Sequence, residues 1–167
     1  MRFIKLAIIS FVLIFGVATL LSFLLPSRVV VSRAIDIDAP KDTILKRVHD
    51  IKEWKSWLVN NDSIPMVVAV VNGRQLLTMG NTTVYISSVT SDEIKTNWRV
   101  KKGKTMPGYL NLSTSPDKSS VTVHWQFVQE LNWYPWEKFS AIMSDKILSP
   151  FMEESLAKLK QEVEGNK

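Results

Sequence analysis

The longest apolar stretch of the chain lies at its amino terminus. No charged residue occurs between Leu6 and Ser27, a run of 22 residues. A helix of this length measures about 33 Å, which is enough to cross the hydrocarbon layer of a bilayer. We therefore expect residues 1–27 to form a transmembrane anchor and residues 28–167 to form one folded domain.

A cleaved secretory signal is the alternative for this stretch, because Arg2 and Lys5 precede the apolar run. The run is longer than the roughly 7–15 residues of a signal core, and Leu-Leu-Pro-Ser at residues 24–27 offers no small-x-small cleavage site. A lipoprotein anchor would need a cysteine, and the chain has none. The short basic start favours a single-pass protein whose domain lies on the extracytoplasmic side.

Beyond the anchor, the hydrophobic pattern predicts strands first and helix last. Apolar and polar residues alternate over 29–38, which indicates a strand, and Ala39-Pro40 ends it. Two short helices are expected at 41–50 and 51–58. Turn signals then separate six further strands, at about 65–71, 75–79, 82–90, 93–101, 108–115 and 119–128. Helix follows at 136–148, is interrupted at Pro150, and continues at 151–164 with an apolar stripe. This order predicts an α+β domain built on an antiparallel meander.

Short motifs mark the two ends of this domain. Ile-Asp-Ile-Asp-Ala-Pro at 35–40 precedes a helix and Ile-Lys-Glu-Trp-Lys-Ser-Trp at 51–57, and Tyr-Pro-Trp-Glu-Lys-Phe at 134–139 precedes the helix at 152–160. In these motifs the chain resembles the START/Bet v1-like superfamily, in its polyketide cyclase/dehydrase and lipid-transport branch. The resemblance implies a helix-grip fold, in which a curved antiparallel sheet wraps around a long carboxy-terminal helix. In that family the cavity between sheet and helix holds sterols, lipids, polyketides or other apolar molecules.

Strand alternation points aromatic side chains toward the closing helix. Trp125 and Phe127 share one face of their strand with Val121 and Val123, and Trp98 shares the corresponding face of another strand with Ile94, Thr96 and Val100. Pockets for small molecules are mostly apolar, so these residues are candidates for a cavity wall. A core that the same side chains fill is the alternative. The predicted ligand-binding residues are Trp98, Val100, Leu110, Leu112, Val123, Trp125, Phe127, Phe151 and Leu156.

The polar residues form no evident catalytic set. His124 falls on the strand face opposite Trp125, and Arg99 lies on a solvated face, whereas Glu130 follows the last strand near the expected cavity mouth. There is no cysteine, no His-x-x-x-His pair, no phosphate-binding glycine-rich loop and no Gly-x-Ser-x-Gly. We therefore predict no catalytic residue, no metal and no cofactor.

Charge excludes one class of partner. The net charge is +5, of which Arg2 and Lys5 belong to the anchor. This mild surplus and the basic turn Lys-Lys-Gly-Lys at 101–104 do not make a nucleic-acid surface, which would need more charge and exposed stacking rings. Three rings at 133–136 are typical of a boundary between water and an apolar phase, either a cavity mouth or a bilayer surface.

The hypothesis is a membrane-tethered domain that binds a hydrophobic small molecule or lipid between its sheet and closing helix. The expected partners are thus the membrane and an apolar molecule, and no protein partner is indicated. A first alternative is a cyclase or dehydratase-type enzyme on the same fold, with Tyr85, His124 or Arg99 turned into the cavity. A second is a membrane-anchored protein-interaction domain with a filled core and no ligand.

Overall fold

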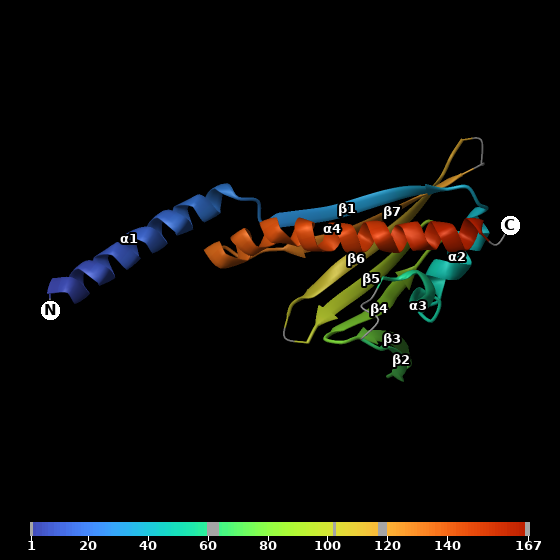
Figure 1. Ribbon diagram of the computed structural model, residues 1–167, viewed down its shortest axis with the longest axis horizontal. Helices are drawn as coiled ribbons and strands as arrows, with labels where there is room; N and C mark the ends of the chain where they lie inside the picture. Colours follow the sequence, from blue (N-terminus) through green and yellow to red (C-terminus); the bar gives the residue numbers. More distant parts are fainter. Residues whose placement is uncertain (1, 60–63, 102, 117–119, 166–167) are drawn as a thin grey trace.

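The structure is a computed structural model that describes residues 2–59, 64–101, 103–116 and 120–165. A long amino-terminal helix extends away from a curved antiparallel sheet, and the last helix lies across that sheet (Figure 1). The elements are α1 (Arg2–Leu24), β1 (Arg28–Ile37), α2 (Lys41–His49), α3 (Trp54–Trp57), β2 (Met66–Val71), β3 (Arg74–Met79), β4 (Thr82–Val89), β5 (Glu93–Val100), β6 (Thr105–Thr114), β7 (Val121–Glu130) and α4 (Pro135–Glu164).

The described strands form one seven-stranded sheet in the order β1-β7-β6-β5-β4-β3-β2. Strands β2 to β7 follow one another as a meander, and β1 returns to pair with β7 along its whole length, from Arg28 opposite Glu130 to Ile37 opposite Val121. The predicted α+β class and helix-grip fold are confirmed. The strand expected at 119–128 includes residue 119, which lies outside the described residues, and β6 begins three residues earlier than expected.

Pro150 does not interrupt the closing helix, so that prediction was wrong. A proline lacks the N–H donor and crowds the carbonyl four residues earlier, which usually breaks a helix. Here Arg33 of β1 bonds to α4 on both sides of the proline. Its guanidinium donates to Asp145 Oδ1 (3.3 Å) and to Ser149 Oγ before Pro150, and to Glu153 Oε1 (2.6 Å) after it. This tertiary contact with a distant strand holds both halves of α4 in one helix.

Six aromatic rings fill the space where the middle of α4 crosses the sheet. Trp98 of β5 and Trp125 of β7 have ring centroids 5.9 Å apart, and Phe151 of α4 lies 5.9 Å from the first and 5.6 Å from the second. Trp54 and Trp57 of α3 close the cluster from the side and are fully buried, with their indole N–H groups donating to the carbonyls of residues 48 and 47. The sixth ring is that of Phe127. The cluster attaches both α3 and α4 to the sheet.

The end of α1 is fastened to the connection between β7 and α4. Ser22, the one buried residue of α1, donates a hydrogen bond to the carbonyl oxygen of Trp133 (3.0 Å). The ammonium of Lys138 is buried and donates to the Leu25 carbonyl (2.7 Å), next to the end of α1, and to the side-chain hydroxyl of Ser27 (3.1 Å). Within the described residues, α1 is the one helix long and apolar enough to cross a membrane, a property that a signal sequence shares.

Gly108 of β6 lies between Thr96 of β5 and Phe127 of β7 in the sheet. A Cβ at this position would come within 2.6 Å of Thr96 Oγ1 and 2.9 Å of a ring carbon of Phe127. The Thr96 hydroxyl cannot easily withdraw, because it donates to the Gly108 carbonyl and accepts the indole N–H of Trp98, each at 3.0 Å. The backbone approach therefore requires glycine.

We expect Gly108→Ala to lower the free energy of unfolding by about 1–3 kcal/mol, because the added methyl overpacks a buried site. Urea unfolding of the full chain in detergent, followed by tryptophan fluorescence, measures the change. Gly103→Ala is the matched control, since a Cβ there meets nothing closer than 3.4 Å. Equal stability of the two variants would contradict this account of Gly108.

Candidate ligand pocket

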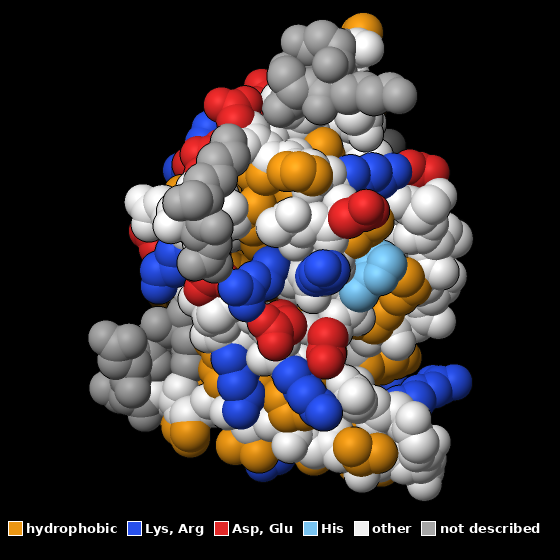
Figure 2. Space-filling view, turned by 90° about the vertical axis from the view of Figure 1, so that its right-hand side faces the viewer, with side chains coloured by type: hydrophobic (Ala, Val, Ile, Leu, Met, Phe, Trp, Pro, Cys, Tyr) orange, Lys and Arg blue, Asp and Glu red, His pale blue; other side chains and the backbone are white. Residues whose placement is uncertain are grey.

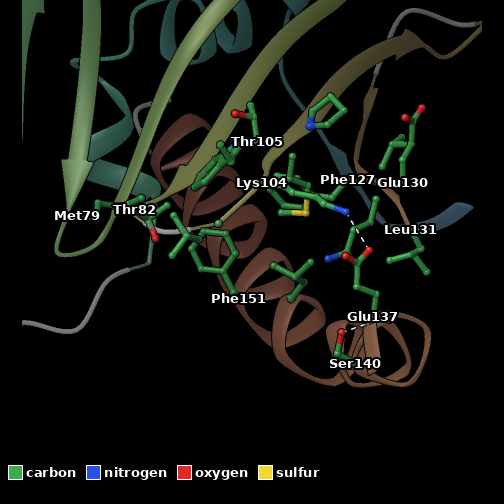
Figure 3. Close-up of a pocket in the computed structure, with 18 of the residues that line it drawn as sticks. Met79, Thr82, Lys104, Thr105, Phe127, Glu130, Leu131, Glu137, Ser140 and Phe151 are labelled. Atoms are coloured by element: carbon green, nitrogen blue, oxygen red, sulfur yellow. Dashed lines mark hydrogen bonds and ion pairs between the residues drawn. The ribbon is translucent and has the colours of Figure 1, made fainter. Parts of the chain in front are cut away.

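A pocket of about 1300 Å³ opens between the sheet and the first half of α4 (Figure 3). Its lining residue Leu131 donates its backbone N–H to the Ser27 carbonyl (2.9 Å), so the pocket lies at the end of the sheet where α1 joins the domain. It lies beside the aromatic cluster, so that the space under α4 is filled at its middle and hollow toward one end. The described lining residues are Val59, Ile64, Met79, Thr82, Trp98, Val100, Gly103, Lys104, Thr105, Met106, Pro107, Phe127, Val128, Gln129, Glu130, Leu131, Asn132, Glu137, Ser140, Leu148 and Phe151.

Three rings form the inner wall of the pocket. Trp98 and Phe127 point inward from neighbouring positions of the sheet, with centroids 5.3 Å apart and planes at 88°. Phe151 meets Trp98 edge to face from α4, at 81°. Strand alternation puts the first two on the concave face, and the Arg33 contact holds the turn of α4 that carries the third. The wall is thus apolar, rigid and shared between sheet and helix.

Polar groups gather at the rim. The ammonium of Lys104, at the start of β6, lies 2.8 Å from Glu137 Oε2 on the first turn of α4, and Figure 3 shows this ion pair beside the pocket. Asn132 donates its backbone N–H to the same oxygen (2.9 Å) and its side-chain amide to Oε1 (3.1 Å). The bond from Lys104, followed by that from the Asn132 N–H, lowers the pKa of Glu137. The ion pair of Lys104 with Glu137 thus ties the connection between β5 and β6 to α4 across the mouth of the pocket. We call this contact the rim latch.

The predicted site residues fall into two groups. Trp98, Val100, Phe127 and Phe151 line the pocket. The other five belong to the packed core, at 0–3% exposure, and are not among the described lining residues. Those five are Leu110, Leu112, Val123, Trp125 and Leu156. Both alternatives drawn from the sequence, a cavity and a filled core, therefore occur side by side.

The polar residues singled out in the sequence lie mostly on the outer face of the sheet. Arg99 bonds to Thr105 Oγ1 at 3.3 Å, and the ring of Tyr85 lies under the guanidinium of Arg74. His124 opposes Ala34 and Asn111 in the register, one position from the inward Trp125. None of Arg99, Tyr85 and His124 is among the described lining residues, whereas Glu130 is.

The residues at the rim of the pocket could not be predicted from the sequence. The sequence places Lys104 in the basic turn at 101–104, of which residue 102 lies outside the described residues, and Glu137 in the motif at 134–139, and neither position indicates a pocket rim. The two are 33 residues apart and meet only through the fold. The early start of β6, which the sequence pattern did not predict, brings Thr105, Met106 and Pro107 into the sheet and so to the pocket.

The family profile described as polyketide cyclase / dehydrase and lipid transport matches residues 28–164. The chain belongs to this family. The match covers all of the sheet and α4 and does not include α1. No curated protein matches the sequence significantly.

Solved structures share the fold of this polyketide cyclase / dehydrase and lipid transport domain at low sequence identity. A protein from Nitrosospira multiformis aligns with a TM-score of 0.60 at 16% identity, over 83% of this chain and 100% of its own. A START superfamily protein from Mycobacterium smegmatis aligns with 0.59 at 14%, over 83% and 99%. The di-domain ARO/CYC protein StfQ of the steffimycin biosynthetic pathway gives 0.63 at 10%, over 83% of this chain and 51% of that one. These likenesses show the helix-grip fold.

The rim latch is expected to depend on pH. Because the pKa of Glu137 is lowered by its partners, its stabilising contribution is complete above the ordinary value of 4.5 and is lost as the pH falls through the lowered pKa. Glu137→Gln should remove the ion pair at all pH values. We expect it to raise hydrogen exchange of the amides at 103–106 by up to about fivefold at pH 7, as is typical of a solvent-screened pair.

Mass spectrometry of the exchanged protein, corrected for intrinsic exchange rates, measures this effect. Glu130→Gln is the control, since it removes a carboxylate from the same rim and leaves the ion pair of Lys104 with Glu137 intact. An acid-dependent rise in exchange that persists unchanged in Glu137→Gln would assign the latch to another group.

Proposed function

We propose that the chain is a membrane-tethered binding protein for a hydrophobic small molecule or lipid, held in the pocket between the sheet and the first half of α4. The observation that carries this proposal is the open-ended pocket whose inner wall is made of Trp98, Phe127 and Phe151. Ligand pockets are commonly apolar clefts of roughly 300–1,000 Å³ with a few polar groups that orient the ligand. This pocket has the same plan, with space for a larger guest.

The polarity of the lining suggests how a guest would lie. Apolar side chains, including those of Met106 and Leu148, surround the depth of the pocket, and the ion pair of Lys104 with Glu137 stands at its rim. An elongated amphiphile would place its apolar body against the rings and its polar end at the rim. Among the described lining residues, the ionisable side chains are Lys104, Glu130 and Glu137, and Lys104 and Glu137 are held in an ion pair with each other.

The tether gives the pocket access to its ligands. Helix α1 is exposed along nearly its whole length and has only Ser22 buried, so it is not a core helix of the domain. As a single-pass anchor with the domain on the extracytoplasmic side, it would keep the pocket at a high effective concentration relative to molecules dissolved in the membrane. The name of the family, polyketide cyclase / dehydrase and lipid transport, includes this class of ligand.

Native mass spectrometry of the full chain, extracted in detergent, tests the proposal. We expect the protein to retain an apolar molecule. Met106→Trp should lower its occupancy at least about tenfold, equivalent to ~1.4 kcal/mol, because the indole would occupy the space beside the inner wall.

Val67→Trp is the matched control, since it adds the same side chain at an exposed position of the edge strand β2, away from the pocket. Equal adducts on the wild type and both variants would show that detergent-phase lipid binds elsewhere, for example to α1. A protein free of any adduct would favour the interaction domain without ligand.

A further inference from the structure

One face of α4 is apolar in its first half and exposed. Trp136, Phe139, Met143 and Ile147 follow one another at intervals of three and four residues, which places them in one row along the helix. Their exposure is 59%, 45%, 50% and 69%. We call this row the α4 apolar row. Exposed apolar patches of this kind mark surfaces that meet a partner or a membrane.

The row ends where α4 reaches the middle of the sheet. Glu154 and Lys158 follow on the same face, about two and three turns after Ile147, and both are exposed. The far end of the molecule, remote from α1, carries charged side chains of both signs beside one another (Figure 2). On this face of α4, exposed apolar side chains are therefore confined to the half of the helix that lies toward α1. The other half carries charged side chains that are exposed to solvent.

The α4 apolar row continues directly into α1. The first turns of α4 extend past the strands toward α1 (Figure 1), and the ring of Phe139 forms a shallow apolar groove with Leu13, Ile14, Val17, Ala18 and Leu21. Phe139 thus lies against the second half of α1, which leads into the membrane interface if α1 spans the membrane.

The contacts between the end of α1 and the start of α4 give independent evidence for the depth of this part of α4 relative to the membrane. Lys138 reaches the carbonyl of Leu25 and the hydroxyl of Ser27, the residues at which the apolar run ends. A lysine at the end of a spanning helix normally places its ammonium at the headgroup level. Trp133 and Trp136, both exposed, flank the same turn, and tryptophan is enriched at that level of a bilayer.

We propose that the α4 apolar row is inserted in the interface of the bilayer that α1 crosses, so that the pocket mouth faces the lipid. This inference rests on the tether in the proposed function. Leu148 and Ser140 of the same half of α4 line the pocket, and the rim residues Leu131 and Asn132 adjoin the end of α1. A ligand would pass between membrane and pocket over an apolar surface without crossing water.

The occupant of the row is lipid, because the surface is continuous with the lipid-facing side of α1 and carries no single-sign charge that would select a charged protein. The cation at the pocket rim, Lys104, is already paired with Glu137, so neutral lipid is sufficient.

The absence of cysteine from the chain allows a direct test with single-cysteine variants. Met143→Cys and Ile147→Cys place a fluorophore (NBD) in the row, and Lys158→Cys places it on the charged part of the same face as a control. The full chain is reconstituted in phosphatidylcholine vesicles. At 143 and 147 we expect a blue-shifted emission, quenching by doxyl-labelled phosphatidylcholine and loss of quenching by aqueous iodide. At 158 we expect the reverse.

Iodide quenching at 143 and 147 equal to that at 158 would overturn the inference. Protection from iodide without doxyl quenching, or protection that disappears as the protein is diluted in lipid, would also overturn it and would point to a second copy of the chain. Intact mass of the reconstituted protein shows whether α1 is retained. Native mass spectrometry of the same samples measures ligand occupancy of the pocket separately. An inserted α4 apolar row without a bound molecule would therefore contradict the ligand proposal alone.

Discussion

The contact of Phe151 with Trp98 and Trp125 is the interaction on which the rest of the structure depends. It is the point where α4 touches the sheet through large, rigid rings, and rings in edge-to-face or tilted contact fix both distance and orientation. On one side of this contact, aliphatic and indole side chains fill the core. On the other side, the helix is held away from the strands and a pocket remains. Core and pocket are two results of one packing contact.

Local patterns predicted the sheet because they depend on neighbours in sequence. Inward positions such as Val123, Trp125 and Phe127 alternate with outward ones, and the observed burial follows this period. The continuous α4 was not predictable in this way, since the residue that supports it through Pro150 is Arg33, at the opposite end of the domain in sequence. The boundary between pocket and core was not predictable either. Nothing in the alternation separates Phe127, which lines the pocket, from Trp125, which does not.

The polar parts of the pocket have the same non-local origin. Lys104, Asn132 and Glu137 come from three different segments, and each is an ordinary surface residue in its own sequence context. Their meeting closes the connection between β5 and β6 onto α4 while the apolar wall stays behind it. An apolar interior with a few polar groups at its edge is the general plan of small-molecule pockets, in which the polar groups fix the orientation of the ligand.

The bonds of Ser22 and Lys138 connect α1, and the residues that follow it, to the segment that begins α4, and they couple the orientation of α1 to that of the domain. A rotation of α1 about its own axis would therefore turn the mouth of the pocket around the membrane normal. A second helix that packs against one side of α1 would fix the direction in which that mouth opens. If α1 spans a bilayer as proposed, a membrane protein that packs against α1 alone, without touching the folded domain, would set the side toward which the pocket opens.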